Sequence, residues 1–136
     1  MITLTKDMEI GVPKVDGQHR ELVDRINALT KMGAKSVSKE ETERTLKLLT
    51  DYVILHFRDE EALHKQSNYP KIEQHKIMHQ AYLKELESLK KEFDANGVSA
   101  KFTLDINKSV INWIVRHIKS ADVEFGKFYN DHPNLR

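Results

Sequence analysis

Long segments with helical spacing of apolar residues are the feature that most limits the fold of this 136-residue chain. Apolar side chains recur at steps of three or four residues, and not at every second residue, over four stretches. The five glycines and three prolines leave these stretches long and the linkers between them short. Short linkers favour antiparallel neighbours. The sequence therefore predicts an all-α fold, an antiparallel up-down-up-down four-helix bundle in a single domain.

Capping residues and helix breakers set the expected bounds of these helices. Asp16 is the expected N-cap of the first helix and Gly33 its stop. Ser38 forms a capping box with Glu41 before the second helix, and Pro70 opens the third. We expect an irregular N-terminal arm over about 1–15 and helices over about 17–32, 39–66, 70–95 and 101–120.

Charge and composition exclude several classes of protein. The 22 Lys and Arg nearly balance the 21 Asp and Glu without forming a basic stripe, which argues against a nucleic-acid partner. The absence of cysteine excludes disulfides, iron–sulfur clusters and thiolate zinc sites, and fits a reducing compartment. The first residues do not resemble a leader peptide, and no apolar run is long enough to cross a membrane. We expect a cytoplasmic protein without a membrane partner.

Histidines and carboxylates interrupt the apolar face of every predicted helix. A buried polar group without a partner costs about 1–3 kcal/mol, so a set spread over four helices needs one common explanation. Metal coordination supplies that explanation. The seven candidate metal ligands are His19, His56, Glu60, His75, His79, His117 and Asp122.

The spacing of two pairs brings their side chains to one face of a helix. His75 and His79 are four residues apart, so both imidazoles can reach one ion, although such a pair alone also fits a surface role. His56 and Glu60 repeat the spacing. Taken alone, Glu60 reads as a surface acid, because at least two residues of the acidic run 59–61 must be solvated. Because Glu60 lies one helical turn from His56, we expect its side chain to point into the bundle.

The third pair has a different spacing. His117 and Asp122 are five residues apart, an angle of about 140° on a straight α-helix. Both can converge on one ion only if the helix ends, loosens or bulges between them. Taken alone, Asp122 reads as a solvated carboxylate at a helix end.

Seven ligands exceed the six positions of one octahedral ion, which indicates two metal ions bridged by carboxylates. Five imidazoles, two bridging carboxylates and one solvent-derived bridge would fill all but one position of such a pair. The count predicts a site that receives one small molecule. Ligation by imidazole without thiolate suits iron, and suits zinc or copper less well.

Five motifs spread over nearly the whole chain resemble those of the hemerythrin family, in particular its small bacterial members. They are Val15-Asp16-Gly17-Gln18-His19, His56-Phe57-x-x-Glu60-Glu61, Tyr69-Pro70, His75-x-x-x-His79 and His117-Ile118-x-x-x-Asp122. The resemblance implies that dioxygen binds at the vacant position of a two-iron centre. It implies that one iron is bound by His75, His79 and His117, that the other is bound by His19 and His56, and that Glu60, Asp122 and an oxo or hydroxo group bridge them.

The leading functional hypothesis is non-enzymatic, reversible dioxygen binding for storage, transport or delivery. A sensor that responds to oxygen or redox state is an alternative. A di-iron enzyme that reduces peroxide or nitric oxide is another, with His64 as proton donor. Metal storage is less favoured, because five nitrogen ligands make a tight, fixed site. Besides dioxygen, the expected partner is an oxygen-accepting or signalling protein that the sequence does not identify.

Two residues are candidates for an apolar ligand pocket, and three depart from the pattern of the relatives. Phe57 and Ile114 are expected either to line the pocket or to pack in the core. Leu4 stands where relatives often carry Trp, Met8 where an aromatic residue is common, and His64 where Met is usual. His64 is expected to have a non-ligand role near a helix end, where the dipole favours a cation, or to act beside the ligands or as one of them.

Overall fold

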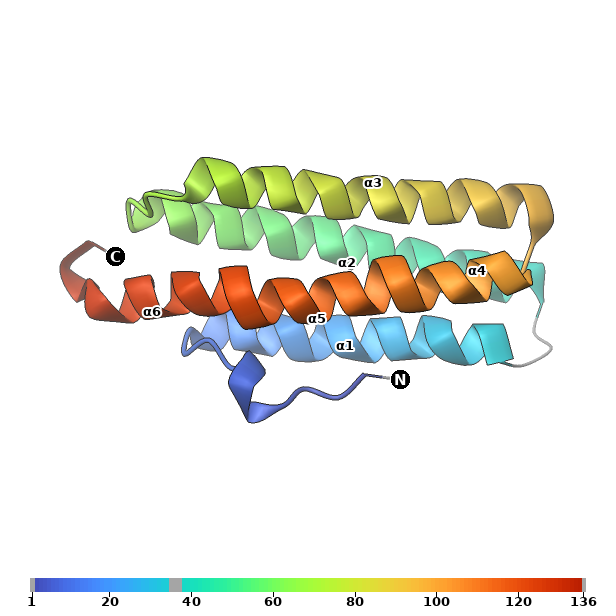
Figure 1. Cartoon of the computed structure of the whole chain (residues 1–136), viewed down its shortest axis with the longest axis horizontal. Helices are drawn as coiled ribbons and strands as arrows, with labels where there is room; N and C mark the ends of the chain where they lie inside the picture. The colour runs from blue at the N-terminus through green and yellow to red at the C-terminus, as the bar shows by residue number, and fades with distance from the viewer. Residues whose placement is uncertain (1, 35–37, 136) are drawn as a thin grey trace.

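The computed structural model describes residues 2–34 and 38–135, and this part of the chain is all-α (Figure 1). Residue 1 of the expected arm lies outside the described residues. The segments are η1 (Lys6–Met8), α1 (Pro13–Ala34), α2 (Lys39–Gln66), α3 (Ile72–Asn96), α4 (Ala100–Asp105), η2 (Ile106–Asn112), α5 (Trp113–His117), η3 (Ile118–Asp122), α6 (Val123–Asp131) and η4 (Pro133–Leu135). The segments from α4 to α6 form one continuous fourth helix, because the backbone stays in the right-handed helical region at every junction.

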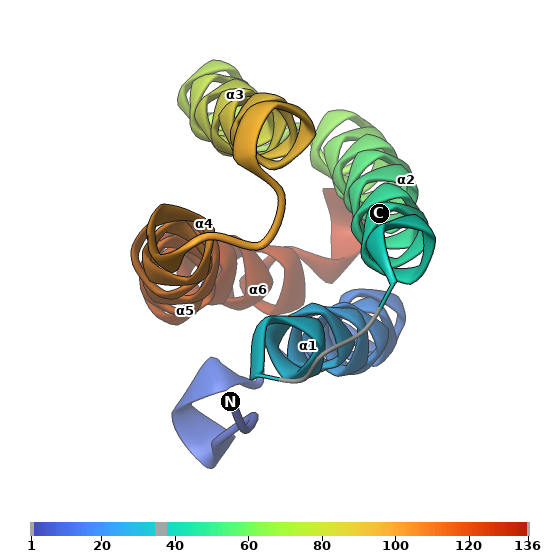
Figure 2. The same cartoon turned by 90° about the vertical axis from the view of Figure 1, so that its right-hand side faces the viewer.

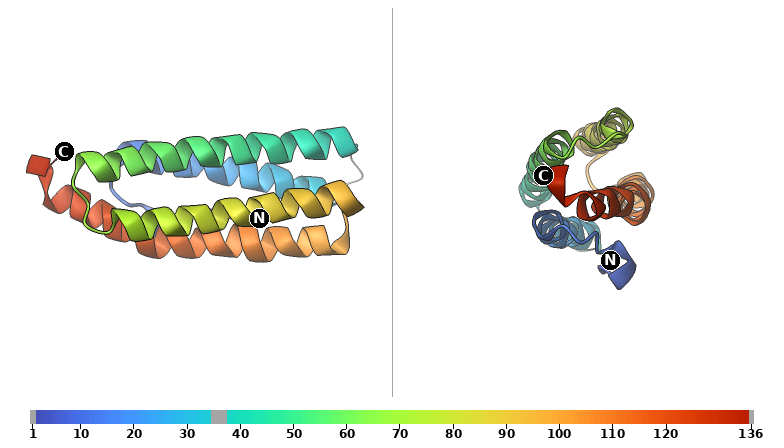
Figure 3. Two further views of the ribbon diagram at one scale, coloured as in Figure 1. Left: turned by 90° about the horizontal axis from the view of Figure 1, so that it is seen from above. Right: turned by 90° about the vertical axis from the view of Figure 1, so that its left-hand side faces the viewer.

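The four helices close into a ring around a common core. Helix α1 packs on α2, α2 on α3, and α3 on α4 and η2. The segments α4 and η2 in turn contact α1, which completes the ring (Figure 2). Successive helices run in opposite directions, and α6 lies at the end where α2 turns into α3 (Figure 3). The predicted up-down-up-down bundle with an N-terminal arm is therefore confirmed. Within the described ranges no helix combines the length and apolarity needed to span a membrane.

Helix α1 begins earlier than expected, because Asp16 is not its N-cap. Proline suits the first position of a helix, and α1 starts at Pro13. The Asp16 backbone N–H donates to Val12 O over 2.9 Å, inside the first turn. Its carboxylate instead accepts from the backbone N–H groups of Ile10 (2.9 Å) and Gly11 (3.1 Å), and so fixes the arm that precedes the helix.

Ser38 is the predicted N-cap of the second helix, and of the two bonds of a capping box the structure has the one that Ser38 accepts; the predicted stop of the first helix is wrong. The Ser38 hydroxyl accepts from the Glu41 backbone N–H over 3.1 Å, and α2 has the expected bounds 39–66. Gly33 lies within α1, which continues to Ala34. A glycine near a helix end can be accommodated in the helix, so it did not mark the end here.

The third and fourth helices also differ from the expected bounds. Pro70 lies in the turn before α3, which begins at Ile72. The fourth helix continues well beyond the expected end at residue 120, through η3 and α6 to Asp131. The apolar face was followed only as far as His117, and the exposed residues 119 and 120 beyond it belong to a helix that continues.

The core consists of a large apolar cluster and a small one, and the histidines lie between them. Phe57 belongs to the large cluster and stacks on His79 with ring centroids 3.7 Å apart. Phe125 and Tyr69 belong to the small cluster, and their rings lie 4.2 Å and 5.1 Å from that of His64. The polar cluster is thus closed off from solvent by apolar packing on two sides.

Candidate metal centre

The structure brings all seven candidate ligands together in the interior of the bundle. Helix α1 contributes one of them, α2 and α3 two each, and the fourth helix the last two. Each is at most 5% exposed. One group, whose ligand atoms all lie within 4.8 Å of one another, contains Glu60, His75, His79, His117 and Asp122, and a second contains His19, His56, Glu60 and Asp122.

Glu60 and Asp122 belong to both groups, and each directs its two oxygens to different histidines. Asp122 Oδ1 lies 2.9 Å from His75 Nε2 and 3.0 Å from His117 Nε2. Its other oxygen, Oδ2, lies 3.1 Å from His19 Nε2. This is the arrangement that a carboxylate needs if it is to join two ions held by separate sets of imidazoles.

Glu60 repeats this division from the opposite side of the bundle. Glu60 Oε1 lies 2.8 Å from His75 Nε2 and 3.1 Å from His79 Nε2. Glu60 Oε2 lies 4.0 Å from His56 Nε2. The two carboxylates therefore separate a three-histidine set (His75, His79 and His117) from a two-histidine set (His19 and His56).

A widened turn places His117 and Asp122 on the same side of the fourth helix. The segment between them, η3, is a π-helix, whose wider turn replaces the four-residue repeat with a five-residue one. The helix was expected to end, loosen or bulge between these two residues. The structure has the bulge, and the helix continues as α6. Asp122 is therefore not a solvated carboxylate at a helix end.

Two imidazoles are oriented by hydrogen bonds that the sequence reasoning did not identify. His56 Nδ1 donates to Gln18 Oε1 over 2.8 Å, and Gln18 Nε2 in turn donates to Asp59 Oδ2 over 2.8 Å. His79 Nδ1 donates to Glu61 Oε2 over 2.7 Å. Each bond leaves Nε2 of its histidine directed to the carboxylates, which is the usual way of fixing a metal-binding imidazole.

The acidic run 59–61 therefore has three separate roles. Glu60 is buried in the site, Glu61 orients His79, and Asp59 acts on His56 through Gln18. Asp59 and Glu61 keep some of the expected contact with solvent, with side chains 21% and 23% exposed, and each also makes a hydrogen bond at the site. Their positions directly beside Glu60 were the signal in the sequence.

Burial and the two carboxylates shift the pKa values of the imidazoles in opposite directions. Burial alone would lower the pKa of His75, but the hydrogen bond with Asp122 and the nearby charge of Glu60 outweigh it and raise the pKa to about 9. Burial lowers the pKa of His56 to about 4, because the carboxylates offset less of the effect of burial at this residue. Burial would raise the pKa of Asp122, yet the neighbouring histidines hold it well below its usual value.

Several polar atoms at the site are buried without a hydrogen bond, which is a test of whether a metal fits there. They include both Glu60 oxygens, Asp122 Oδ2, His79 Nε2 and both His19 nitrogens. Buried polar atoms of this kind are costly unless something binds them. Bound cations would satisfy the oxygens and the lone pairs of neutral imidazoles together, so the residues present fit a pair of metal ions.

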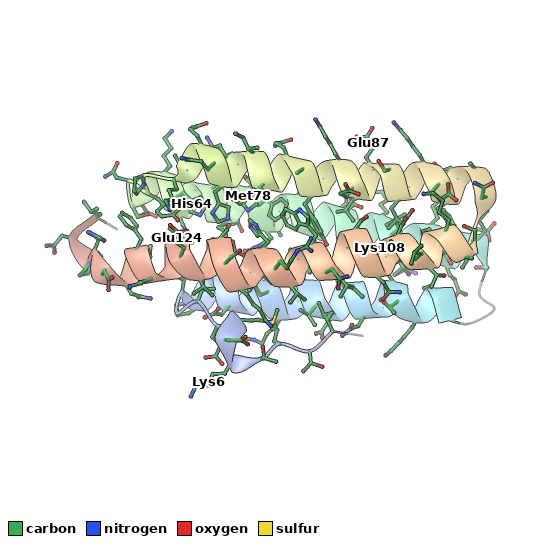
Figure 4. All side chains as sticks on the ribbon, in the orientation of Figure 1. Lys6, His64, Met78, Glu87, Lys108 and Glu124 are labelled. Carbon is green, nitrogen blue, oxygen red and sulfur yellow. The ribbon has the colours of Figure 1, made fainter. Side chains whose placement is uncertain are left out.

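His64 lies directly beside the three-histidine set. It is fully buried, its Nε2 lies 3.7 Å from Glu60 Oε1, and its ring lies 4.4 Å from that of His75 (Figure 4). The expected place in the last turn of α2 is correct, but the expected cation is not. Burial lowers the pKa of His64 to about 4, so the imidazole is neutral at pH 7.

The two candidate pocket residues are both buried in the large apolar cluster. Besides stacking on His79, Phe57 approaches the His56 ring with centroids 5.8 Å apart, so it contacts both histidine sets. Ile114 precedes His117 by one turn in α5. Their packing is observed, whereas pocket lining remains a prediction.

Comparison with known proteins places these features in a family. Residues 10–128 match the family model of the hemerythrin HHE cation binding domain. The chain is 31% identical to a bacteriohemerythrin of Methylococcus capsulatus, covering 82% of each chain. It is 32% identical to a myohemerythrin of Theromyzon tessulatum, covering 86% of this chain and 84% of the relative. A crystal structure of wild-type hemerythrin superposes with a TM-score of 0.80 at 28% identity, covering 93% of this chain and 96% of that one.

Proposed function

Because the chain belongs to the hemerythrin family, we propose that it binds dioxygen reversibly at a non-haem pair of iron ions. The family implies a di-iron site and an oxygen-binding fold. For this chain we propose a non-enzymatic role in oxygen storage, transport or delivery. A cytoplasmic location is part of the proposal, since a chain without cysteine suits a reducing compartment.

One observation carries the proposal, namely the division of carboxylate oxygens between two histidine sets. Asp122 directs Oδ1 to His75 and His117 and Oδ2 to His19. In the proposal the three-histidine set holds one iron, the two-histidine set holds the other, and Glu60 and Asp122 bridge them. The two-histidine set has one ligand fewer, which leaves a position for a small molecule.

When bound, an iron pair would supply the electrons that convert dioxygen into a form that the centre can hold. The protein's own part is to position ligands and exclude water. Gln18 and Glu61 hold His56 and His79 in their orientations. Phe57 covers the His79 ring and reaches that of His56. A dry apolar surround favours reversible binding, because water and protons promote irreversible oxidation.

The position of His64 argues against the enzymatic alternative. The rings and carboxylate that it contacts include His75, His79 and Glu60, on the side of the three-histidine set. A proton donor to a ligand bound at the opposite set would have to be within hydrogen-bond reach of it. Carrier function is thus favoured over peroxide or nitric oxide reduction.

An oxygen titration after anaerobic reduction tests the proposal. The iron-loaded protein should develop a ligand-to-iron charge-transfer band on adding oxygen, lose it under vacuum, and regain it when oxygen returns. His132→Ala, which changes an exposed histidine in the tail, should behave as the unaltered protein. Irreversible oxidation within one cycle would reject the carrier function, and steady turnover with a reductant would favour the enzyme.

A further inference from the structure

The N-terminal arm covers a cavity that extends to one of the proposed iron ligands. Its volume is about 360 Å³, and arm residues 4–6, 8 and 9 line it on one side. On the opposite side it is lined by the start of α1, including Asp16, His19 and Arg20. His19 belongs to the two-histidine set, where the proposed function places the vacant position.

A wide depression that is open to solvent continues the first cavity along the arm. Its volume is about 370 Å³, and it is lined by residues 2–4 of the arm and by Arg20, Val23, Asp24 and Asn27 of α1. Leu4 and Arg20 line both cavities, so they stand where the two spaces meet. Together the cavities follow α1 from Asn27 to His19.

The arm is tied to α1 at both of its ends. At its start, the Ile2 backbone N–H donates to Asn27 Oδ1 and Asn27 Nδ2 donates to Ile2 O, each over 2.9 Å. At its end, Asp16 holds Ile10 and Gly11.

Between these ends the arm is joined to the fourth helix. Asp7 forms an ion pair with Lys119 over 3.4 Å, and η1 packs on η3, the segment that carries Asp122. The arm therefore bridges α1 and the fourth helix (Figures 1 and 2).

The lining suits small neutral molecules, and Arg20 is the cation that an entering anion would meet in both spaces. Leu4 and Met8 give it an apolar side, and the Met8 side chain is only 2% exposed. Lys6 and Arg20 give the lining two positive charges, and Glu9, Asp16 and Asp24 give it three negative ones. A single cation on such a path affects the entry of a charged ligand and leaves that of a neutral one unchanged.

We propose that the two cavities beneath the arm form the passage by which dioxygen and small anions such as azide reach the His19 side of the centre. This inference rests on the proposed function and adds the route to it. Leu4 and Arg20 control the passage, Leu4 by its size and Arg20 by its charge.

Filling the cavity at Leu4 tests the route. In Leu4→Trp, the association rate constant of azide with the oxidised, iron-loaded protein should fall by roughly tenfold. The dissociation rate should fall equally, because a narrowed passage slows both directions and leaves the equilibrium affinity unchanged. Leu104→Trp is the matched control, since Leu104 is 51% exposed on α4. Unchanged rates in a folded Leu4→Trp protein would overturn the proposal.

Two further measurements keep the test decisive if that variant folds poorly. Leu4→Ala enlarges the passage and should leave the azide association rate equal or faster, whereas a slower rate counts against the route. Arg20→Gln should slow azide but not dioxygen, and the difference should vanish at high salt. Equal effects on both ligands would refute the role assigned to Arg20.

Nuclear magnetic resonance gives a readout that does not need iron chemistry. In the full chain loaded with diamagnetic zinc, dissolved dioxygen should enhance relaxation of the Met8 methyl group far more than of the Leu49 methyl groups. Both side chains are buried, with Met8 2% and Leu49 0% exposed, but only Met8 lines the cavity. Equal relaxation would show that dioxygen does not enter.

Failure of the route and failure of the proposed function give different results. If the protein does not bind dioxygen reversibly, azide kinetics and the relaxation of Met8 still report on the passage. If it binds dioxygen while Leu4→Trp leaves the kinetics unchanged, only the route is wrong.

Discussion

His117 Nε2 and Asp122 Oδ1 lie 3.0 Å apart although a five-residue step separates them, because the helix between them makes a π-turn. The same carboxylate reaches His19 on α1 with its second oxygen. The turn thus allows the Asp122 side chain to connect the two histidine sets. The charge and the shape of this side chain can be tested separately.

Asp122→Asn keeps the shape of the side chain and removes its charge. We expect the iron content to fall from two ions per chain to one or fewer, because a neutral amide cannot bridge two cations. Iron per chain, measured after loading and desalting, checks this. Asp105→Asn removes a carboxylate that pairs with Lys101 away from the site and should retain two irons. Two irons in Asp122→Asn would contradict the bridging role.

Glu61→Ala removes the acceptor that orients His79 while leaving every proposed ligand in place. Loss of such a partner typically lowers metal affinity by about 10- to 100-fold. Competition with a calibrated chelator measures the change. Glu61→Gln retains an acceptor oxygen and should recover much of the affinity. If Glu61→Ala binds metal as tightly as the unaltered protein, the hydrogen bond has no role in holding the metal.

His64→Met tests whether His64 is a metal ligand or a buried imidazole that binds no metal. Both ring nitrogens of His64 lack a hydrogen bond, so removing them should leave the stability of the metal-free protein equal or raise it by about 1 kcal/mol. Oxygen affinity and the rate of autoxidation should stay unchanged. Denaturant unfolding and repeated oxygenation cycles test the two statements. A loss of metal affinity would instead identify His64 as a ligand.

The raised pKa of His75 predicts opposite pH trends with and without metal. Its pKa is about 9 in the fold against a usual 6.5, so the folded metal-free protein holds an extra proton between these values. Stability from this group is complete below pH 6.5 and is lost as pH rises through 9, by at most about 1.4 kcal/mol per pH unit.

Metal binding needs neutral imidazoles, so apparent metal affinity should rise over the same pH range and loading should release protons. Unfolding titrations of the metal-free protein and zinc titrations with a pH indicator test the pair of trends. Stability of the metal-free protein that rises between pH 6.5 and 9 would contradict the assignment.

Gly126→Ala tests the contact between α6 and the arm. A Cβ atom at Gly126 would lie 2.0 Å from Ile10 O, so the arm must move. We expect a loss of about 1–3 kcal/mol, visible as a lower thermal midpoint. Gly17→Ala is the matched control, because its nearest neighbour would be the flexible Arg20 side chain at 3.6 Å. That change should stabilise α1 by up to about 1 kcal/mol.

The clustering of the candidate ligands could be predicted from the sequence because all but Asp122 continue an apolar helical face. His75 and His79 keep the four-residue step that periodicity detects, and their positions in α3 agree with it. The bulge after His117 was one of three alternatives, since spacing alone does not say how a helix deforms. Its selection depends on packing between helices.

Features that depend on tertiary contacts were missed or wrongly assigned. Asp16 resembles an N-cap locally, yet it binds the backbone of the arm. Glu61 resembles a surface acid until α3 places His79 beside it. His64 resembles a helix-end cation until Phe125 and Tyr69 exclude solvent from it. In each case the decisive neighbour comes from another element.

All the proposed ligands are carried by helices that pack against one another, and none by a loop. The backbone beneath each ligand therefore cannot follow a change in charge at the centre. The helices therefore hold the seven ligand side chains close together whether or not metal is bound. Metal would bind to a site that is already assembled, so its removal should leave the helices folded.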